Sequence, residues 1–533
     1  MVCRSDAASL PIVVRVVGAG LLAVAAIPSH AHGFAQRYDL PVPLWLYISG
    51  AAATVVVSFL MIALFFRRGG KMLGYPRFNL LRFALMRILF QGVLPAFLRL
   101  FSLALFVLVL AAGWLGVQAP FDNIAPTTVW VVWWVGFAYL SGLLGNLWPL
   151  VNPWQNSYVA FEYLLAWINP NRRASLQLPL PSWLGVWPAV LLYVLFSWLE
   201  LIWHHSDTPA SIATAALVYS LITWSGMALF GREPWLQRAE VFTLVFGLLS
   251  RFAITETRAC QQPHCARCAT ANGMAAGEAG INCAVCFRHA DARQRQWLLR
   301  PPGVGLLISR PASLSLTILV VLMLASVTFD GLMATPLWAD LMQWALYSPQ
   351  LRPLLLLLQP LFSDVLSLLA TLGLASLVLL FLVVYLGFCA LMRRLLDNAL
   401  NLPTVAELAG YFVLTLIPIA LAYHLAHYLS YLLIVGQYMI PLISDPFGFG
   451  WDLFGTGHYF VDIGIVSARF VWITSVIAIV VGHIIAVFLA HVMAQRLFAQ
   501  RRLVLRSQIP MLVLMVGYTM ASLWILAQPI VEN

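Results

Sequence analysis

The sequence carries very little charge. Charged residues make up 9% of the 533 residues, whereas about a quarter is usual in soluble globular proteins. Lysine is almost missing, with Lys71 as its single occurrence, so arginine supplies nearly all of the positive side of a net charge of +10. The chain has no stripe of basic residues with interleaved aromatic residues. These shortages exclude an ordinary soluble domain and argue against nucleic-acid binding, which normally shows a basic patch.

Apolar residues, in contrast, are abundant. They make up 62% of the chain, and runs of about 20 recur from end to end, the length that spans a bilayer. A helix pairs its own backbone polar groups, as a bilayer requires. We therefore predict an all-α fold, a polytopic bundle of about ten transmembrane helices after a cleaved signal peptide. The predicted spans are Val42–Phe66, Ala96–Val117, Thr128–Val151, Trp183–Trp203, Pro209–Phe230, Ser313–Leu337, Val365–Met392, Ala406–Val435, Arg469–Met493 and Ile509–Ala527.

Arginine is distributed unevenly among the connecting loops. Alternate loops carry most of it, as at Arg393 and Arg394, and Arg352 is the exception on the other side. Because basic loops stay inside, this pattern predicts a mature N-terminus and a C-terminus that both lie outside. Together with the bacterial-type export signal at the start of the chain, it predicts a protein of the bacterial cytoplasmic (inner) membrane. Phe78–Gln91 and Arg238–Arg251 mix arginine with apolar residues at helical spacing. We predict that both are amphipathic helices lying at the membrane surface.

The first 31 residues have the features of an export signal. Basic residues precede a short apolar run, 16–27, and Ser29 and Ala31 form a small-x-small cleavage pattern. Cleavage after Ala31 would make His32 the new amino terminus. Its amine and imidazole nitrogens together would suit copper. An ordinary exported N-terminus is the alternative.

The predicted eighth span contains a pair of histidines. His424 and His427 are three residues apart, so their rings lie on one helix face. His483 and His491 follow in the ninth span. Ionisable groups at membrane depth are costly and mark functional sites. We predict that these four histidines belong to a metal, haem or catalytic site, with zinc, copper or iron as the candidate metals. Hydrogen bonding between packed helices is the alternative.

Two acidic residues are predicted to lie at the same depth as the histidine pair. Glu200 is near the end of the fourth span, and Asp330 is near the end of the sixth. Histidine with Asp or Glu is the ligand set of hydrolytic metal sites, and without a metal the same groups relay protons. We therefore predict His424, His427, Asp330 and Glu200 as catalytic residues, with solvation at the membrane surface as the alternative for the two acids. The aromatic, glycine-rich loop 444–452 is predicted to cover a pocket for a small apolar or aromatic substrate.

One loop predicted to be cytosolic gathers five of the seven cysteines. Two Cys-x-x-Cys pairs are separated by fourteen residues, and a fifth cysteine precedes them; the five are Cys260, Cys265, Cys268, Cys283 and Cys286. Two such pairs fit a closed tetrahedral zinc site. Thiols stay reduced in the cytosol, so a metal is favoured over disulfides. A closed site leaves no position for a substrate, so its predicted role is structural. A loose cysteine-rich loop is the alternative.

Three stretches resemble a known family. They are His-Gly-Phe-Ala-Gln-Arg-Tyr-Asp-Leu-Pro-Val-Pro-Leu at 32–44, Ala-Tyr-His-Leu-Ala-His-Tyr at 422–428 and Ser-Asp-Pro-Phe-Gly at 444–448. They are similar to bacterial membrane proteins known as fenitrothion hydrolases. The resemblance runs along most of the chain and implies an exported start, many spans and cleavage of aryl phosphotriesters. It brings no assigned catalytic residues, and the cysteine loop is not part of the family pattern. The native substrate stays open.

These observations predict four regions and leave three functions open. The regions are a signal peptide, 1–31; a first membrane half of five spans, 32–254; a cytosolic metal-binding loop, 255–300; and a histidine-rich second half of five spans, 301–533. The first function is a metal-dependent membrane hydrolase that opens outward and cleaves aryl phosphotriesters. The second is a copper- or haem-binding membrane protein, and the third is a transporter for a proton-coupled or apolar solute. The predicted partners are the lipid bilayer and a small apolar or aromatic substrate; the sequence does not reveal protein partners.

Overall fold

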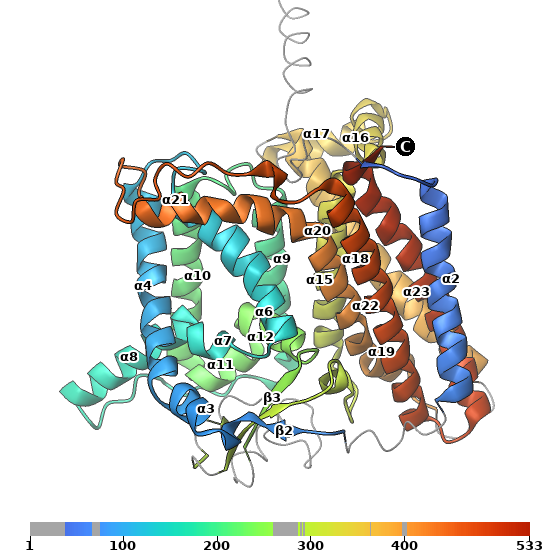
Figure 1. The fold of residues 1–533 in the computed structure, drawn as a ribbon, viewed down its shortest axis with the longest axis horizontal. Coiled ribbons are helices and arrows are strands. Elements are labelled where there is room, and N and C mark those ends of the chain that lie inside the picture. Colours follow the sequence, from blue (N-terminus) through green and yellow to red (C-terminus); the bar gives the residue numbers. More distant parts are fainter. Residues whose placement is uncertain are drawn as a thin grey trace, which may run out of the picture.

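The computed structural model describes residues 38–66, 75–259, 286–287, 290–291, 294–362, 364–396 and 402–532. Ten helical segments in these ranges are long and apolar enough to cross a membrane. Together they form a helical bundle (Figure 1). The prediction of a polytopic all-α membrane protein is confirmed. The predicted signal peptide, 1–31, and His32 lie outside the described residues.

The ten spanning segments match the ten predicted runs one for one. They are α2 (Leu44–Phe65), α4 (Leu94–Leu115), α5–η4–α6 (Ile124–Pro126, Thr127–Gly136, Phe137–Leu143), η5–α9 (Ser182–Leu184, Trp187–Leu201), α10 (Pro209–Phe230), α15 (Leu314–Met333), α18 (Val365–Leu395), α19–η9–α20–η10–α21 (Val405–Phe412, Val413–Leu416, Ile417–Ile434, Val435–Tyr438, Met439–Ser444), α22 (Ala468–Leu497) and α23 (Arg501–Ile530).

Shorter elements connect the spans. They are η2 (Leu80–Arg82), α3 (Ala84–Ile88), η3 (Leu89–Val93), α7 (Trp148–Val151), α8 (Pro153–Ile168), α11 (Arg232–Arg238), α12 (Val241–Ser250), η7 (Val304–Leu306), α16 (Pro336–Tyr347), α17 (Arg352–Leu358), η8 (Gln359–Leu361), η11 (Ile463–Ile465) and the strands β1 (Tyr38–Asp39), β2 (Phe78–Asn79), β3 (Thr255–Ala259), β4 (Arg295–Leu299) and β5 (Val531–Glu532).

Both described ends of the chain lie on one face of the bundle. β1 pairs in parallel with β5, which joins Tyr38 to Val531 and Asp39 to Glu532. This face, uppermost in Figure 1, also carries α16, α17 and α21, and we call it the terminal face. This arrangement fits an even number of crossings, such as ten.

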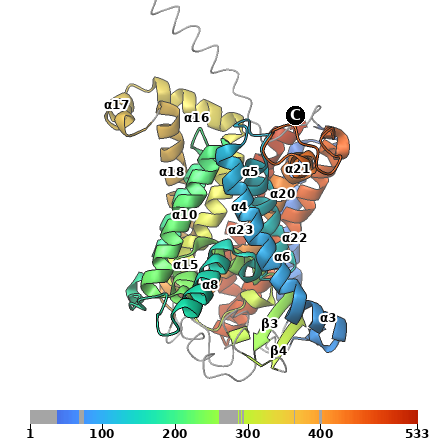
Figure 2. The ribbon, with the colours of Figure 1, turned by 90° about the vertical axis from the view of Figure 1, so that its left-hand side faces the viewer.

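Three spans form the centre of the bundle. The segments that contain α20, α15 and η4 are the most deeply buried of the ten, whereas α4, α18 and α2 have most of their surface exposed. Turning the molecule shows α16 and α17 projecting beyond the bundle on the terminal face, while α3 projects on the opposite face (Figure 2). Two of these three buried spans carry Asp330 and His427 of the candidate site.

The helix α12 corrects one prediction. The segment Arg238–Arg251 was expected to lie at the membrane surface. Instead the chain turns at Glu240, and α12 packs inside the bundle with Phe242, Phe246 and Leu249 buried. Its amino end is capped by Glu240, whose carboxylate accepts hydrogen bonds from the amides of Phe242 and Thr243. Side chains of other helices supply further partners for that carboxylate, which is why a polar helix end can be buried.

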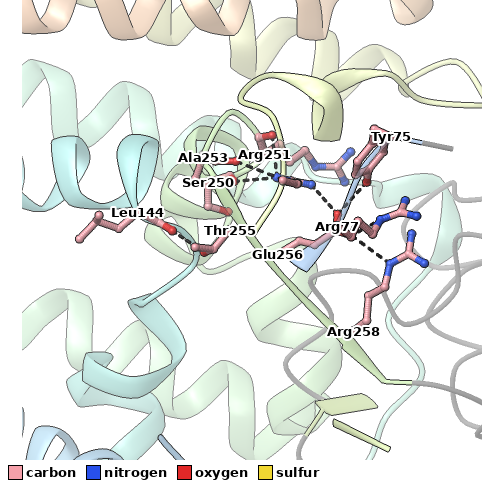
Figure 3. A network of polar contacts seen from close by, with 10 residues as sticks. Tyr75, Arg77, Leu144, Ser250, Arg251, Ala253, Thr255, Glu256 and Arg258 are labelled. Atoms are coloured by element: carbon pink, nitrogen blue, oxygen red, sulfur yellow. Dashed lines mark hydrogen bonds and ion pairs between the residues drawn. The ribbon is translucent and has the colours of Figure 1, made fainter. Parts of the chain in front are cut away.

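A small antiparallel sheet lies at the face opposite the termini. Its strand order is β2–β4–β3, and β3 and β4 are the two ends of the predicted cysteine loop. The buried Glu256 on β3 is the centre of a polar network (Figure 3). Its carboxylate contacts Arg300 at 2.8 Å, Arg77 at 2.9 Å and Arg258 at 3.0 Å, and it accepts a hydrogen bond from Tyr75.

Arg300 connects this sheet to the end of α12. Besides binding Glu256, its guanidinium donates to the backbone carbonyls of Ser250, Arg251 and Ala253. Gly305 is close by: a Cβ there would come within 2.6 Å of both terminal guanidinium nitrogens, so only glycine fits. The network therefore fixes the chain on both sides of the predicted cysteine loop.

Replacing Glu256 with glutamine should strongly destabilise this face. The fully buried guanidinium of Arg300 would lose its charged partner, and breaking a buried ion pair typically costs about 3–5 kcal/mol. Arg258→Gln is the control, because that side chain is 26% exposed and the carboxylate of Glu256 would keep Arg300 and Arg77 as charged partners. Thermal unfolding in detergent should show a clearly lower midpoint for Glu256→Gln than for Arg258→Gln. Equal midpoints would contradict this account.

Candidate functional site

The predicted residues Asp330 and His427 are in direct contact. Asp330 is one helical turn from the end of α15, and its Oδ2 lies 2.8 Å from His427 Nε2 on α20. The hydroxyl of Tyr428 donates to the same oxygen at 2.6 Å. The imidazole side chain is 2% exposed, whereas the carboxylate side chain is 18% exposed. A buried imidazole is thus hydrogen-bonded to a carboxylate that is still partly exposed to solvent.

Glu200 joins this pair from a third span. It lies near the end of α9, within electrostatic range of Asp330, and Trp134 of η4 lies beside it. Tyr428 is within range of both acids. Two carboxyl groups and an imidazole therefore gather where α9, α15 and α20 meet. We call Glu200, Asp330, His427 and Tyr428 the acid–imidazole cluster.

The segment that carries Trp134 is wound as a π-helix over Thr127–Gly136. Such wide turns are rare and are frequent at functional sites. This π-helix was not predicted from the sequence. Its effect is local: Trp134 is placed between Glu200 and His424, with its ring centroid 6.1 Å from that of His424.

His424 has a different environment from its partner in the pair. Its ring meets three aromatic rings edge-on, with centroid distances of 6.1 Å to Trp134, 5.3 Å to Tyr139 and 4.8 Å to Tyr428. Its Nε2 is buried and has no hydrogen-bond partner among the described residues. His424 and His427 therefore lie near each other, but only His427 binds a carboxylate.

The other two span histidines lie apart from the cluster. His483 is fully buried midway along α22, where its Nδ1 contacts the backbone carbonyl of Ile479 at 2.8 Å. His491 lies two turns further, and its ring contacts Gln495, Gln508 and the carbonyl of Phe66. His483 and His491 therefore do not lie beside His424 and His427, and a shared role for the four stays a prediction.

The described residues contain no complete metal site. Within the described ranges, no three His, Cys, Asp or Glu side chains are grouped so that they could hold a metal ion. His424 offers one nitrogen, but Nε2 of His427 is engaged by Asp330. Cys286 is buried, and the other four cysteines of the predicted zinc site, Cys260, Cys265, Cys268 and Cys283, lie outside the described residues. Zinc at the cysteine loop, and zinc, copper or iron at the histidines, stay predictions.

A cavity of about 1000 Å³ opens on the terminal face above the cluster. Its wall combines aromatic rings with polar groups: Phe121, Asp122, Ser430, Tyr431, Tyr438, Asp445, Trp451, Asp452, His458, Tyr459 and Phe460 are among its lining residues. Residues of the loop 444–452 contribute to this lining, and a substrate held there stays a prediction. Aromatic walls with a few polar groups are typical of sites for small organic molecules.

The acidic residues of this loop mostly stabilise the loop itself. Asp445 accepts from the backbone amides of Phe449, Gly450 and Trp451, and Asp452 accepts from that of Gly457. Such contacts are typical of tight turns. Gln437 of η10 fixes the chain just after this loop, because it hydrogen-bonds to both the Tyr459 hydroxyl and the backbone of Asp462. The loop is therefore an ordered part of the cavity lining, stabilised by its own hydrogen bonds.

Tyr431 links the cavity to the cluster. It lines the cavity, lies one turn after His427 on α20, and is within electrostatic range of Glu200, Asp330 and Asp207. None of the four cluster residues is among the described lining residues. Tyr431 is therefore the residue that the cavity and the surroundings of the cluster have in common.

A second histidine contact lies nearby and was not predicted. Nε2 of His204 lies 2.5 Å from Asp364 Oδ2 and 3.0 Å from Ser367 Oγ. Although serine, histidine and aspartate meet here, both partners share one ring nitrogen, whereas a catalytic triad uses both. Asp364 caps α18 by accepting from the amide of Ser367. The group therefore joins the ends of two spans and lacks the geometry of a nucleophile.

Comparisons with known proteins add no assignment. No protein-family model, no curated protein and no solved structure matches this chain.

Proposed function

We propose that this protein couples proton exchange at the acid–imidazole cluster to the binding and passage of a small aromatic solute. The observation that carries the proposal is the position of the cluster: it lies where three spans meet, within electrostatic range of Tyr431, and Tyr431 also lines an aromatic cavity. Ionisable groups inside a membrane mark substrate paths and proton relays.

The cluster has the composition that proton exchange needs. Glu200 and Asp330 are near enough to repel each other when both are ionised, so a proton held by one is favoured. His427 and Tyr428 stabilise the charge on Asp330 by hydrogen bonds. A change in the number of bound protons alters these contacts on α20. Because α20 also carries Tyr431, it conveys the change to the cavity wall.

Hydrolysis of aryl phosphotriesters is the second candidate, and the Asp330–His427 contact favours it. The carboxylate binds Nε2–H of the neutral imidazole, which leaves the lone pair on Nδ1. An imidazole held in this way can act as a general base. It would take a proton from a water that attacks phosphorus, and a nitrophenolate would leave without needing an acid. The family resemblance implies the same chemistry.

One experiment separates the two candidates. The purified protein is reconstituted in liposomes with a trapped pH-sensitive dye and exposed to fenitrothion and to unreactive nitroaromatic solutes of similar size. Solute-driven movement of protons without nitrophenolate release supports coupled transport. Release of nitrophenolate above that of empty liposomes supports the hydrolase. If neither signal exceeds that of empty liposomes, both proposals fail.

A further inference from the structure

The cavity on the terminal face has an acidic lining. The carboxylates of Asp122, Asp445 and Asp452 are among its lining residues, whereas the described lining contains no lysine or arginine. The chain as a whole has a net charge of +10, so this lining is opposite in sign to the rest of the protein. A concave surface with charges of one sign raises the local concentration of ligands of the opposite sign.

Two chain segments carry these carboxylates, and their backbones are joined. The turn after α4 contributes Asp122, and the loop after α21 contributes the other two. The amide of Val117 donates to the carbonyl of Phe447 at 2.8 Å. Gly448 has a φ of 73°, and a Cβ there would lie 2.6 Å from the Asp122 carbonyl oxygen, so a side chain would prevent this close approach. The acidic surface is therefore formed before any ligand binds.

The three carboxylates differ in how many partners they already have. Both oxygens of Asp445 accept hydrogen bonds from amides of its own loop. Asp452 uses only Oδ1, which accepts from the amide of Gly457. Its Oδ2 and the carboxylate of Asp122 have no hydrogen bond or ion pair among the described residues. Asp122 and one oxygen of Asp452 are therefore available to a ligand.

A buried hydroxyl also faces the cavity. Ser430 is only 4% exposed, yet it is one of the lining residues. Its hydroxyl has no hydrogen-bond partner among the described residues. A buried hydroxyl without a partner is costly, and a ligand in the cavity would supply the missing partner. This observation points to a ligand independently of the acidic residues.

Aromatic rings make up much of the remaining lining. Phe121 and Tyr438 have ring centroids 4.8 Å apart. The ring of Trp451 lies 5.5 Å from those of Phe447 and Phe449. The faces of such rings attract cations, and quaternary ammonium groups are the best-known ligands of this kind. The other aromatic lining residues are Tyr431, Tyr459 and Phe460.

This combination fits an organic cation better than a metal ion. Calcium and magnesium require a shell of several oxygen ligands, and no three His, Cys, Asp or Glu side chains are grouped in this way within the described residues. The volume of about 1000 Å³ is that of a site for a drug-sized molecule. Carboxylates that do not converge, together with aromatic rings, suit a cation that carries apolar groups.

We propose that this cavity binds an organic cation, a substituted ammonium compound with an aromatic or apolar group. The carboxylates of Asp122 and Asp452 attract the ammonium, the aromatic rings pack against it and against the apolar group, and the Ser430 hydroxyl binds a polar substituent. This inference deepens the proposed function, because it names the charge of the solute. It rests on that function only in taking the cavity as the solute site.

Isothermal titration calorimetry tests the charge of the ligand. The full chain is placed in nanodiscs of phosphatidylcholine, which carries no net charge, and titrated with benzyltrimethylammonium, benzyl alcohol or benzoate. Empty nanodiscs correct for partition into lipid. The cation should bind at least about ten-fold more tightly than the alcohol, because only the cation is attracted by the carboxylates and the ring faces. Benzoate should not bind measurably. Equal affinity for cation and alcohol, or tighter binding of benzoate, would overturn the proposal.

A double variant, Asp122→Asn with Asp452→Asn, locates the bound cation. Asparagine at 452 keeps the Oδ1 acceptor for Gly457, so the loop should persist. The affinity for benzyltrimethylammonium should fall by about ten-fold, while that for benzyl alcohol should change little. Asp340→Asn is the control, since Asp340 is exposed on α16 and is not among the described lining residues. If the double variant binds the cation as tightly as the control does, these carboxylates do not form the site.

The calorimetry and the liposome assay can fail separately. The comparison of three ligands uses the parent chain and requires no movement of protons. Binding of the cation without solute-driven proton movement would support this site and contradict only the coupling. Proton movement driven by a neutral nitroaromatic solute, with no preference for the cation in calorimetry, would support the proposed function and overturn the present inference.

Discussion

Replacing Asp330 with asparagine is expected to abolish solute-driven proton movement. Asparagine keeps the shape of the side chain but cannot ionise. His427 would lose the charge that stabilises its imidazolium form, and Tyr428 would lose a charged acceptor. If the activity is hydrolysis, the rate should fall by about 10²–10⁴-fold, the usual contribution of general acid–base groups. Initial rates in reconstituted liposomes measure either outcome.

Two further variants make this result specific. Asp340→Asn changes an exposed aspartate on α16, near the same face of the bundle, and should keep the parent rate. Asp330→Glu retains the charge and should keep more activity than Asp330→Asn. Size-exclusion profiles of all three proteins show whether the bundle assembles. An Asp330→Asn protein that is assembled and as active as the parent would remove the cluster from the mechanism.

The number and placement of the spans could be predicted, because the length of an apolar run reflects bilayer thickness directly. The ends were less predictable. The third span ends at Leu143 and not at Val151, since α7 forms a separate turn, and the eighth continues to Ser444. These differences depend on hydrogen bonds between polar backbone groups inside the protein. The hydropathy of a sequence contains no information about such bonds.

The site was predictable in its residues but not in its arrangement. His427, Asp330 and Glu200 are conspicuous because ionisable groups are rare inside spans. Tyr428 and Trp134 could not be recognised, since tyrosine and tryptophan occur throughout this chain. Their importance depends on which spans become neighbours. The same is true of the strands β3 and β4, whose pairing is stabilised by Glu256 and its arginines.

Glu240 illustrates most clearly what the sequence does not show. It lies in a segment expected at the membrane surface, yet it is fully buried. Besides the amides at the start of α12, its carboxylate accepts hydrogen bonds from Tyr219 at 2.6 Å, Asn152 at 3.2 Å and Trp148 at 3.3 Å, and from the Thr243 hydroxyl. One carboxylate thus joins α7, α8, α10 and α12.

Replacing Glu240 with alanine is therefore expected to prevent assembly of the first membrane half. Five side-chain and backbone donors, and the Thr243 hydroxyl, would remain buried without this acceptor. Each such group typically costs about 1–3 kcal/mol, and α12 would also lose the cap that complements its helix dipole. The summed cost of these unsatisfied groups is comparable to the free energy of unfolding of a whole protein, roughly 5–15 kcal/mol. We expect little monodisperse protein on size-exclusion chromatography in detergent.

The control for this prediction is Glu233→Ala, seven residues earlier on α11. Glu233 is 31% exposed and lies 3.7 Å from Arg232, which also binds Glu162, so the loss of this long contact should cost about 1 kcal/mol or less. This variant should elute and unfold as the parent does. Glu240→Gln tests the charge separately, because its amide nitrogen would face donors and should restore little of the loss. If Glu240→Ala gives parent amounts of folded protein with an unchanged unfolding midpoint, the carboxylate does not hold α12 inside the bundle.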